Sequence, residues 1–154
     1  MTIKADVKRD IKLDEGWNPK PYKCTEGIWT IGFGTNITRI TREEGEALLD
    51  LRLDKIINHD LLSFTKELPN LNDARKTVLI NMLYQLGLQG VKKFKRMRQA
   101  IVNKDFKRAS IEMVDSKWHR QTPNRCRRLA RVMETGKANN KIINHFRPDE
   151  RPEL

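Results

Sequence analysis

The chain of 154 residues has the length of one domain, or of two small lobes that share a core. Its hydrophobic content of 38% and charged content of 33% exclude a disordered chain and favour a folded, helix-rich protein. The formal net charge of +11 favours polyanionic partners, among them nucleic acid, anionic lipid and acidic cell-wall polymers, without choosing between them.

The N-terminal segment contains no apolar run long enough for a signal peptide or a membrane span. We therefore expect synthesis in the cytoplasm, with help needed for any later export. Two cysteines, Cys24 and Cys126, are too few for a disulfide scaffold, and with three scattered histidines they match no metal-site spacing. The sequence thus predicts no metal site and no cofactor.

The first predicted element is an amphipathic helix over residues 2–14. Apolar residues recur there at four-residue spacing, which is typical of one face of a helix: Ile3, Val7 and Ile11. Gly16, Pro19 and Pro21 are expected to end this helix.

A β-hairpin is predicted next, in the sequence KCTEGIWTIGFG, residues 23–34. The turn falls at 25–27, and the returning strand follows at 28–31. Residues 35–40 are expected to form a polar connection.

A linking helix begins at the sequence TREE, residues 41–44, which has the pattern of a capping box between Thr41 and Glu44. Apolar residues of this helix include Leu48 and Leu51. Pro69 and Asn70 mark a break before the next helix.

From residue 72 the chain is predicted to be helical almost to its end. One helix ends at Gly87, two short helices follow, and a last helix opens with Thr122 as N-cap and Pro123 at its first position, closing at Gly136. On this last helix, Cys126 is expected to face the core. Trp118, which precedes the helix, is expected to pack against other side chains of the protein.

These elements predict an α+β fold of two lobes within one domain, residues 1–154. The front lobe spans about 13–55. The rear lobe spans about 72–136 and includes the N-terminal helix 2–14, and a polar tail, 137–154, is expected to be poorly ordered.

Three residues near the hairpin suggest chemistry. Eight residues separate Glu15 from Cys24, and five separate Cys24 from Thr30. A helix end packed against a hairpin can direct all three side chains into one cleft, where a carboxyl can act as a general acid and a hydroxyl can orient water. Each also has a structural interpretation: a solvated charge at a helix end, a small apolar group, and an ordinary strand residue.

This spacing of Glu, Asp or Cys, and Thr resembles the catalytic pattern of phage-type lysozymes, the endolysins of glycoside hydrolase family 24, and in particular their T-even bacteriophage members. Further matching pieces occur in the family's order between residues 13 and 136: DEG, TIGFG, VLINMLYQLG and SKWHRQTPNRCRR. The resemblance therefore covers most of the chain.

The resemblance implies a two-lobe fold whose cleft binds peptidoglycan, and hydrolysis of the β-1,4 bond between N-acetylmuramic acid and N-acetylglucosamine. Glu15 would be the proton donor, Thr30 would position the attacking water, and Arg125 would contact the Glu15 carboxylate from the rear lobe. Inversion of the anomeric centre is then expected. The substrate-binding residues carried over from the family are Glu26, Asn36, Tyr84 and Gln85.

The chain departs from the family pattern in three places. Cys24 stands where an aspartate is usual, Thr35 stands where a histidine is common, and the segment 35–45 is shorter. Three roles are open for Cys24: a thiolate that stabilises positive charge, a neutral thiol that helps to hold water, or a nucleophile that forms a covalent intermediate with retention.

The family further implies a monomer that accumulates in the host cytoplasm and reaches the cell wall or periplasm through a membrane opening made by a holin. No specific nucleic-acid partner is expected, because the basic residues are interspersed with acidic ones and no recognition motif is present. Two alternatives are a lytic transglycosylase, which uses one glutamate and no water, and a cationic wall-binding or membrane-binding protein without catalysis.

Overall fold

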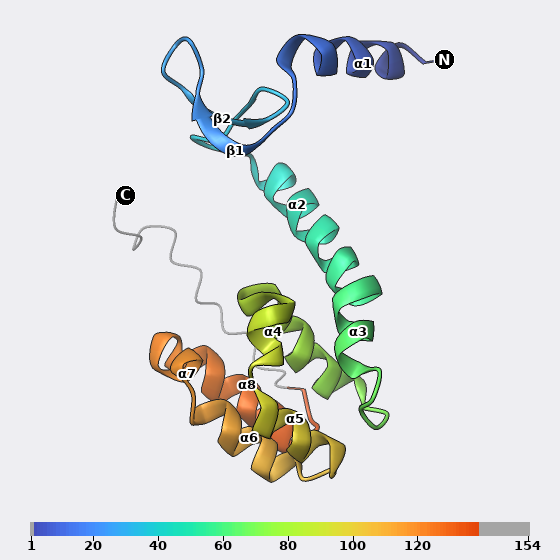
Figure 1. Cartoon of the computed structure of the whole chain (residues 1–154), viewed down its shortest axis with the longest axis vertical. Helices are drawn as coiled ribbons and strands as arrows, with labels where there is room; N and C mark the ends of the chain where they lie inside the picture. The colour runs from blue at the N-terminus through green and yellow to red at the C-terminus, as the bar shows by residue number, and fades with distance from the viewer. Residues whose placement is uncertain (1, 139–154) are drawn as a thin grey trace. The chain divides into compact units, whose positions relative to one another are not determined.

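The computed structural model describes residues 2–138, so nearly all of the predicted tail, 137–154, lies outside the described residues. Contacts between residues divide the chain into two compact units, 1–50 and 51–154. Most of the chain is helical, with one small antiparallel sheet (Figure 1), which confirms the predicted α+β class. The predicted lobe limits, and the assignment of the N-terminal helix to the rear lobe, stay predictions.

The first unit begins with helix α1, Ile3–Glu15, which confirms the predicted helix to within one residue at each end. It ends at Gly16, whose φ of 67° suits glycine and whose N–H donates to the carbonyl of Lys12 at 3.2 Å. The apolar stripe is present but is not buried, since Ile3 is 85% exposed.

Three strands follow α1: β1 (Asn18–Lys23), β2 (Trp29–Gly32) and β3 (Thr35–Asn36). They pair antiparallel in the order β1-β2-β3, so β2 is the central strand. Thr30 lies at its middle, opposite Tyr22 of β1 and Asn36 of β3. The predicted hairpin is confirmed, and its central strand positions Thr30 rigidly.

The sheet begins before the predicted hairpin, and one prediction about it is wrong. Pro19 and Pro21 lie within β1, where the ladder with β2 is irregular between Asn18 and Tyr22. Proline is tolerated there because β1 is an edge strand and needs fewer ladder hydrogen bonds. The first two residues of the expected polar connection, Thr35 and Asn36, form β3 by pairing with β2.

The linking helix α2, Arg42–Lys55, begins at the predicted capping box. The Thr41 N–H donates to Glu44 Oε2 at 2.8 Å, and the Glu44 N–H donates to Thr41 Oγ1 at 3.2 Å. The helical path then continues without a break through a π-helix, Ile56–Leu61, and α3, Leu62–Thr65. The π-helix was not predicted.

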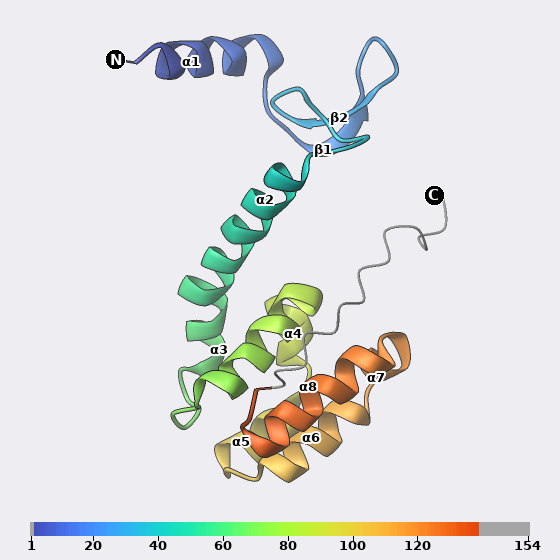
Figure 2. The same cartoon turned by 180° about the vertical axis from the view of Figure 1, so that it is seen from behind.

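The second unit packs five further helices around one apolar core (Figures 1 and 2): α4 (Asp73–Lys92), α5 (Lys95–Val102), α6 (Phe106–Val114), α7 (Lys117–Gln121) and α8 (Pro123–Thr135). Helix α6 contacts α8 extensively, and α4, α5 and α7 join them. Every buried hydrophobic residue of the described chain lies between Ile56 and Met133. Trp118 and Cys126 are buried, as predicted.

Glycines interrupt or end two of these helices where predicted. Gly87 has a φ of 69° and breaks the path of α4, and Gly136 ends α8 in the left-handed conformation. Thr122 precedes Pro123 as predicted, but its hydroxyl does not cap α8. It donates instead to the carbonyl of Trp118 at 3.2 Å, because α7 ends directly beside it.

Candidate active site

Glu15 is the last residue of α1, and its exposed carboxyl group lies against Gly34, in the turn between β2 and β3. A Cβ atom at Gly34 would stand 2.6 Å from the Glu15 carboxyl carbon, so the Glu15 side chain keeps this position only beside glycine. Neighbouring rings hold this junction: Trp17 and Phe33 have centroids 5.0 Å apart, and Lys12 Nζ lies 5.3 Å from the Phe33 centroid. The helix end is thereby packed against the sheet.

Cys24 and Thr30 share one hydrogen-bond acceptor, the carbonyl oxygen of Ile28. The Cys24 N–H donates to it at 3.0 Å, and Thr30 Oγ1 donates to it at 3.0 Å. Cys24 also accepts from the Gly27 N–H at 2.8 Å, which closes the turn. The Thr30 hydroxyl and the Cys24 backbone are therefore fixed beside each other, with Thr30 only 4% exposed.

The other two residues of the first unit that the resemblance assigns to substrate binding are exposed. Glu26 lies at the tip of the hairpin turn. Asn36 lies on β3, where its Oδ1 accepts from the Thr38 N–H at 2.9 Å and from Thr38 Oγ1 at 2.8 Å. Its Nδ2 makes no hydrogen bond among the residues that the structure describes, and so can donate to a ligand.

In the second unit, Arg125 of α8 is held by Asn81 of α4. Arg125 Nε donates to Asn81 Oδ1 at 2.8 Å, and a second guanidinium nitrogen lies 3.5 Å from the Asn81 carbonyl oxygen. Partial burial lowers the pKa of Arg125, and the charge of Arg128 lowers it further, while Tyr84 opposes both. Tyr84 and Gln85 follow Asn81 by one helical turn, so these residues lie on one side of α4.

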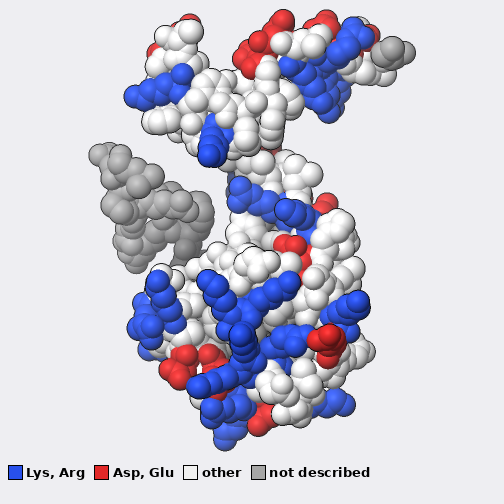
Figure 3. Space-filling model, viewed as in Figure 1, with Lys and Arg blue, Asp and Glu red and all other residues white. Residues whose placement is uncertain are grey.

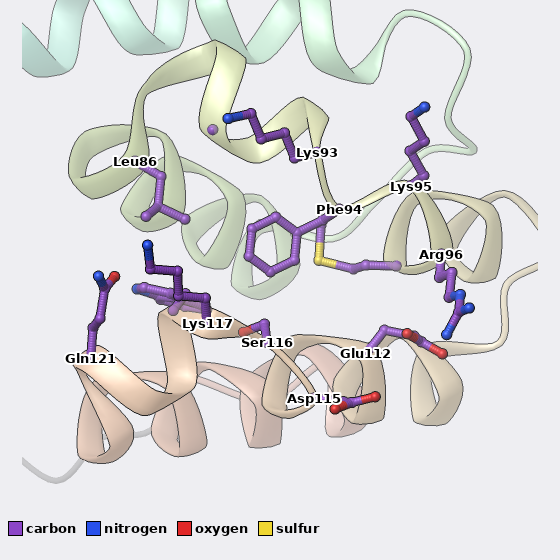
Figure 4. Close-up of a pocket in the computed structure, with 13 residues that line it drawn as sticks. Leu86, Lys93, Phe94, Lys95, Arg96, Glu112, Asp115, Ser116, Lys117 and Gln121 are labelled. Carbon is purple, nitrogen blue, oxygen red and sulfur yellow. The ribbon is translucent and has the colours of Figure 1, made fainter.

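Gln85 is fixed by Trp118, whose Nε1–H donates to Gln85 Oε1 at 2.8 Å. Trp118 also lines a pocket of about 520 Å³, together with Leu86, Phe94 and Met97. Figure 4 shows the Phe94 ring at the centre of this pocket, with Glu112 and Asp115 on one side and Gln121 at the far end. An apolar floor with a charged rim thus adjoins Gln85.

The predicted site residues form two groups, one in each unit. Glu15, Cys24, Thr30, Glu26 and Asn36 gather on the small sheet and the end of α1. Arg125, Tyr84 and Gln85 gather on α4 and α8. The expected contact between Arg125 and Glu15 stays a prediction.

Sequence reasoning missed three supporting groups: Gly34, Asn81 and the Ile28 carbonyl. Gly34 carried a signal, since a glycine that ends the piece TIGFG can mark a close approach of backbone to a neighbouring group. Asn81 carried a weaker one, as a polar residue within an apolar helical stretch. The Ile28 carbonyl carried none, because backbone acceptors are invisible in a sequence.

Within residues 2–138, no three His, Cys, Asp or Glu side chains gather closely enough to hold a metal ion. No helix in that part of the chain combines the length and apolarity needed to cross a membrane.

Comparisons with known proteins identify the family of this chain. The family model described as Phage lysozyme matches residues 12–133. "Probable T4-type lysozyme 1" of Dictyostelium discoideum is 34% identical over 88% of this chain and 97% of its own length, and "Probable T4-type lysozyme 2" is 32% identical over 86% and 95%. "Pre-baseplate central spike protein Gp5" of Enterobacteria phage T4 is 30% identical over 82% of this chain, which spans 27% of that longer protein.

The family match covers both groups of site residues, from the helix end at Glu15 to Arg125 of α8. The chain therefore belongs to the phage lysozyme family and is a lysozyme, a glycoside hydrolase.

Proposed function

We propose that this lysozyme is an endolysin that hydrolyses the β-1,4 bond between N-acetylmuramic acid and N-acetylglucosamine in peptidoglycan and so lyses host cells. One observation carries the assignment of its site. The carboxyl group of Glu15 lies at the edge of the same three-stranded sheet whose central strand holds Thr30, with Cys24 tied to Thr30 through one carbonyl oxygen.

Glu15 acts as the general acid in this proposal. It protonates the glycosidic oxygen as the bond to the anomeric carbon breaks, so the departing sugar leaves as an alcohol. Its position supports the role, since the carboxyl is exposed for contact with a sugar while Gly34 limits the directions in which it can turn.

Thr30 positions the attacking water. Its hydroxyl proton is already donated to the Ile28 carbonyl, so its oxygen is left as an acceptor. A water that donates to this oxygen keeps a lone pair for attack at the anomeric carbon, from the face opposite Glu15. Inversion of the anomeric centre follows from this geometry.

Cys24 takes the place of the family's aspartate beside this water. As a thiolate it stabilises the positive charge that develops on the sugar ring, and as a neutral thiol it helps Thr30 to hold the water. The shared Ile28 carbonyl supports either role, because it keeps Cys24 next to Thr30.

The remaining site residues bind the glycan strand. Glu26 and the free amide nitrogen of Asn36 contact it from the first unit, and Tyr84 and Gln85 contact it from the second. Arg125, held by Asn81, contacts the Glu15 carboxyl group in this proposal. The proposed lobes are residues 13–55, and 72–136 together with the N-terminal helix.

The family also supplies the setting in which this enzyme acts. We infer that it is a monomer, that it collects in the host cytoplasm, and that a holin-type opening gives it access to the wall.

A turbidity assay on permeabilised Gram-negative cells tests the proposal. Glu15→Gln keeps the size of the side chain but cannot donate a carboxyl proton, so we expect lysis to slow by about 100-fold or more. Asp14→Asn, one residue earlier in α1, makes the same change in charge and should lyse at the unaltered rate. Equal lysis by both variants would leave wall disruption by a cationic protein as the better explanation.

A further inference from the structure

A second hollow, of about 400 Å³, lies within the second unit, where the end of α3 meets α4 and α5. Its lining consists of Ser63, Phe64, Lys66, Glu67, Lys92, Lys95 and Arg98. Four of these seven residues are cations and one is an anion. We call Lys66, Lys92, Lys95 and Arg98 the basic hollow.

Only one of the four cations is neutralised. Arg98 pairs with Glu67 at 2.7 Å, and this hydrogen bond and the Arg98 charge hold the pKa of Glu67 below its usual value. Among residues 2–138, Lys66, Lys92 and Lys95 form no ion pair. Three lysines that line this concave surface therefore have no ion-pair partner within the described residues.

The surrounding surface extends this charge. Lys93 and Arg96 lie next in the chain, which places five cations within residues 92–98. Figure 4 shows the Lys95 side chain extending away from Phe94. Lys and Arg side chains also cover much of the face of this unit that Figure 3 shows, with smaller acidic clusters between them. A flexible ammonium group is a point charge that is well suited to binding phosphate. It lacks the planar fork with which arginine forms two parallel hydrogen bonds to a carboxylate.

An exposed apolar residue lies near Lys66, at the end of α3. Leu62 is 61% exposed and precedes Lys66 by four residues, and Lys66 still has helical backbone angles, so the two side chains lie on the same side of this turn. A cluster of cations beside an exposed aliphatic side chain is typical of surfaces that bind the headgroups and outer acyl region of an anionic bilayer. A peptidoglycan strand, which is hydrophilic, gives Leu62 no comparable partner.

We propose that the basic hollow is a docking site for a lipid phosphate headgroup, which holds the enzyme against an anionic membrane surface. The charge complementarity is direct: the hollow has three uncompensated cations, and each phospholipid of such a surface presents a phosphate. The proposal does not depend on the role of Glu15 in hydrolysis.

Binding to vesicles tests the proposal with two matched triple variants of the whole chain. Lys66→Gln, Lys92→Gln and Lys95→Gln together remove the unpaired cations of the hollow. Three exposed cations elsewhere in the second unit are replaced in the control: Lys107→Gln, Arg120→Gln and Lys137→Gln. Both triples lose the same net charge, and thermal unfolding followed by circular dichroism checks that both are folded.

The expected result is a partition coefficient onto phosphatidylglycerol-containing vesicles about 100-fold lower for the hollow triple, since each lysine near such a surface contributes about fivefold. The control triple should lose less than about tenfold, through the long-range field alone. Hydrolysis of soluble, lipid-free peptidoglycan fragments should stay within about twofold for the hollow triple, since none of its three lysines is among the residues proposed to act in catalysis or to bind the glycan.

A single variant gives a second test that does not rely on removing charge. Glu67→Gln frees Arg98, so we expect vesicle binding to strengthen by about fivefold. Equal losses in the two triples, or equal wild-type binding to phosphatidylcholine vesicles, would overturn the proposal. So would a hollow triple that keeps vesicle binding but loses binding to purified sacculi or to DNA.

Discussion

Replacement of Gly34 by alanine tests how the end of α1 holds Glu15. The added Cβ would stand 2.6 Å from the Glu15 carboxyl carbon and 3.1 Å from its Cγ, which are distances that real Cβ atoms avoid. Because the atoms in the way are the far end of a flexible, exposed side chain, Glu15 should turn aside rather than force the backbone to move. The general acid would then be misplaced while the fold survives.

Gly27 offers a matched control for the strain in the backbone. Its φ of 76° is close to the 71° of Gly34, but a Cβ at Gly27 meets nothing within 4 Å. Alanine in this left-handed conformation costs about 1–2 kcal/mol at either position. We therefore expect both variants to lose a similar free energy of unfolding, but only Gly34→Ala to lose activity, by about 100-fold or more.

The comparison requires two measurements on both variants: the free energy of unfolding by urea titration, and the rate of peptidoglycan hydrolysis at a temperature where both are folded. A Gly34→Ala protein as active as Gly27→Ala would refute the proposed placement of Glu15. A much larger loss of stability at Gly34 alone would show that the Glu15 side chain is fixed rather than free to turn.

Four further predictions concern the other site residues and the cysteines. Cys24→Asp restores the family's usual carboxylate and should remain active in the turbidity assay, whereas inactivity there combined with an active Glu15→Gln would reverse the assignment. Asn81→Ala should lower the free energy of unfolding by about 1–3 kcal/mol and slow hydrolysis, because it removes the acceptor for Arg125; Asn81→Asp keeps an acceptor and should recover both. Burial raises the pKa of the Cys126 thiol from 9.0 to about 11, so a thiol reagent at pH 8 should modify the half-buried Cys24 alone until denaturant is added. The folded chain thus holds the Cys126 proton more tightly than the unfolded chain, and the stability that this thiol contributes should fall as pH rises from 9 through 11, as denaturation of wild type against Cys126→Ala can measure.

Local sequence signals predicted the ends of elements well. The capping box at Thr41 and Glu44, the break in α4 at Gly87 and the helix end at Gly136 depend on atoms within a few residues, so their patterns alone were sufficient. Thr122 is the exception, because the carbonyl of Trp118 at the end of the preceding helix competes for its hydroxyl.

Features that depend on distant partners could not be predicted in the same way. Thr35 and Asn36 form too short a segment to predict as a strand, and asparagine disfavours strands, so β3 depends on pairing with the free edge of β2. Arg125 and its acceptor Asn81 are 44 residues apart. The sequence located Arg125 through a family motif, but it could not indicate which side chain would hold the guanidinium group in place.

The same limit applies to the proposed catalytic residues. Their spacing predicted a helix end and a hairpin that meet, and the structure places Glu15 against the sheet at Gly34. The link between Cys24 and Thr30 passes through the Ile28 carbonyl, a backbone atom that every residue type possesses.

The central claim is that Glu15 and a water held at Thr30 hydrolyse the glycan. Digestion of purified peptidoglycan in ¹⁸O-labelled water, followed by mass spectrometry of the muropeptides, tests it most directly. The account predicts products that carry one added water, with the heavy oxygen at the newly formed reducing end, and no such products from Glu15→Gln. Products with an anhydro sugar and no added water, formed by the wild-type enzyme, would contradict it and identify a lytic transglycosylase instead.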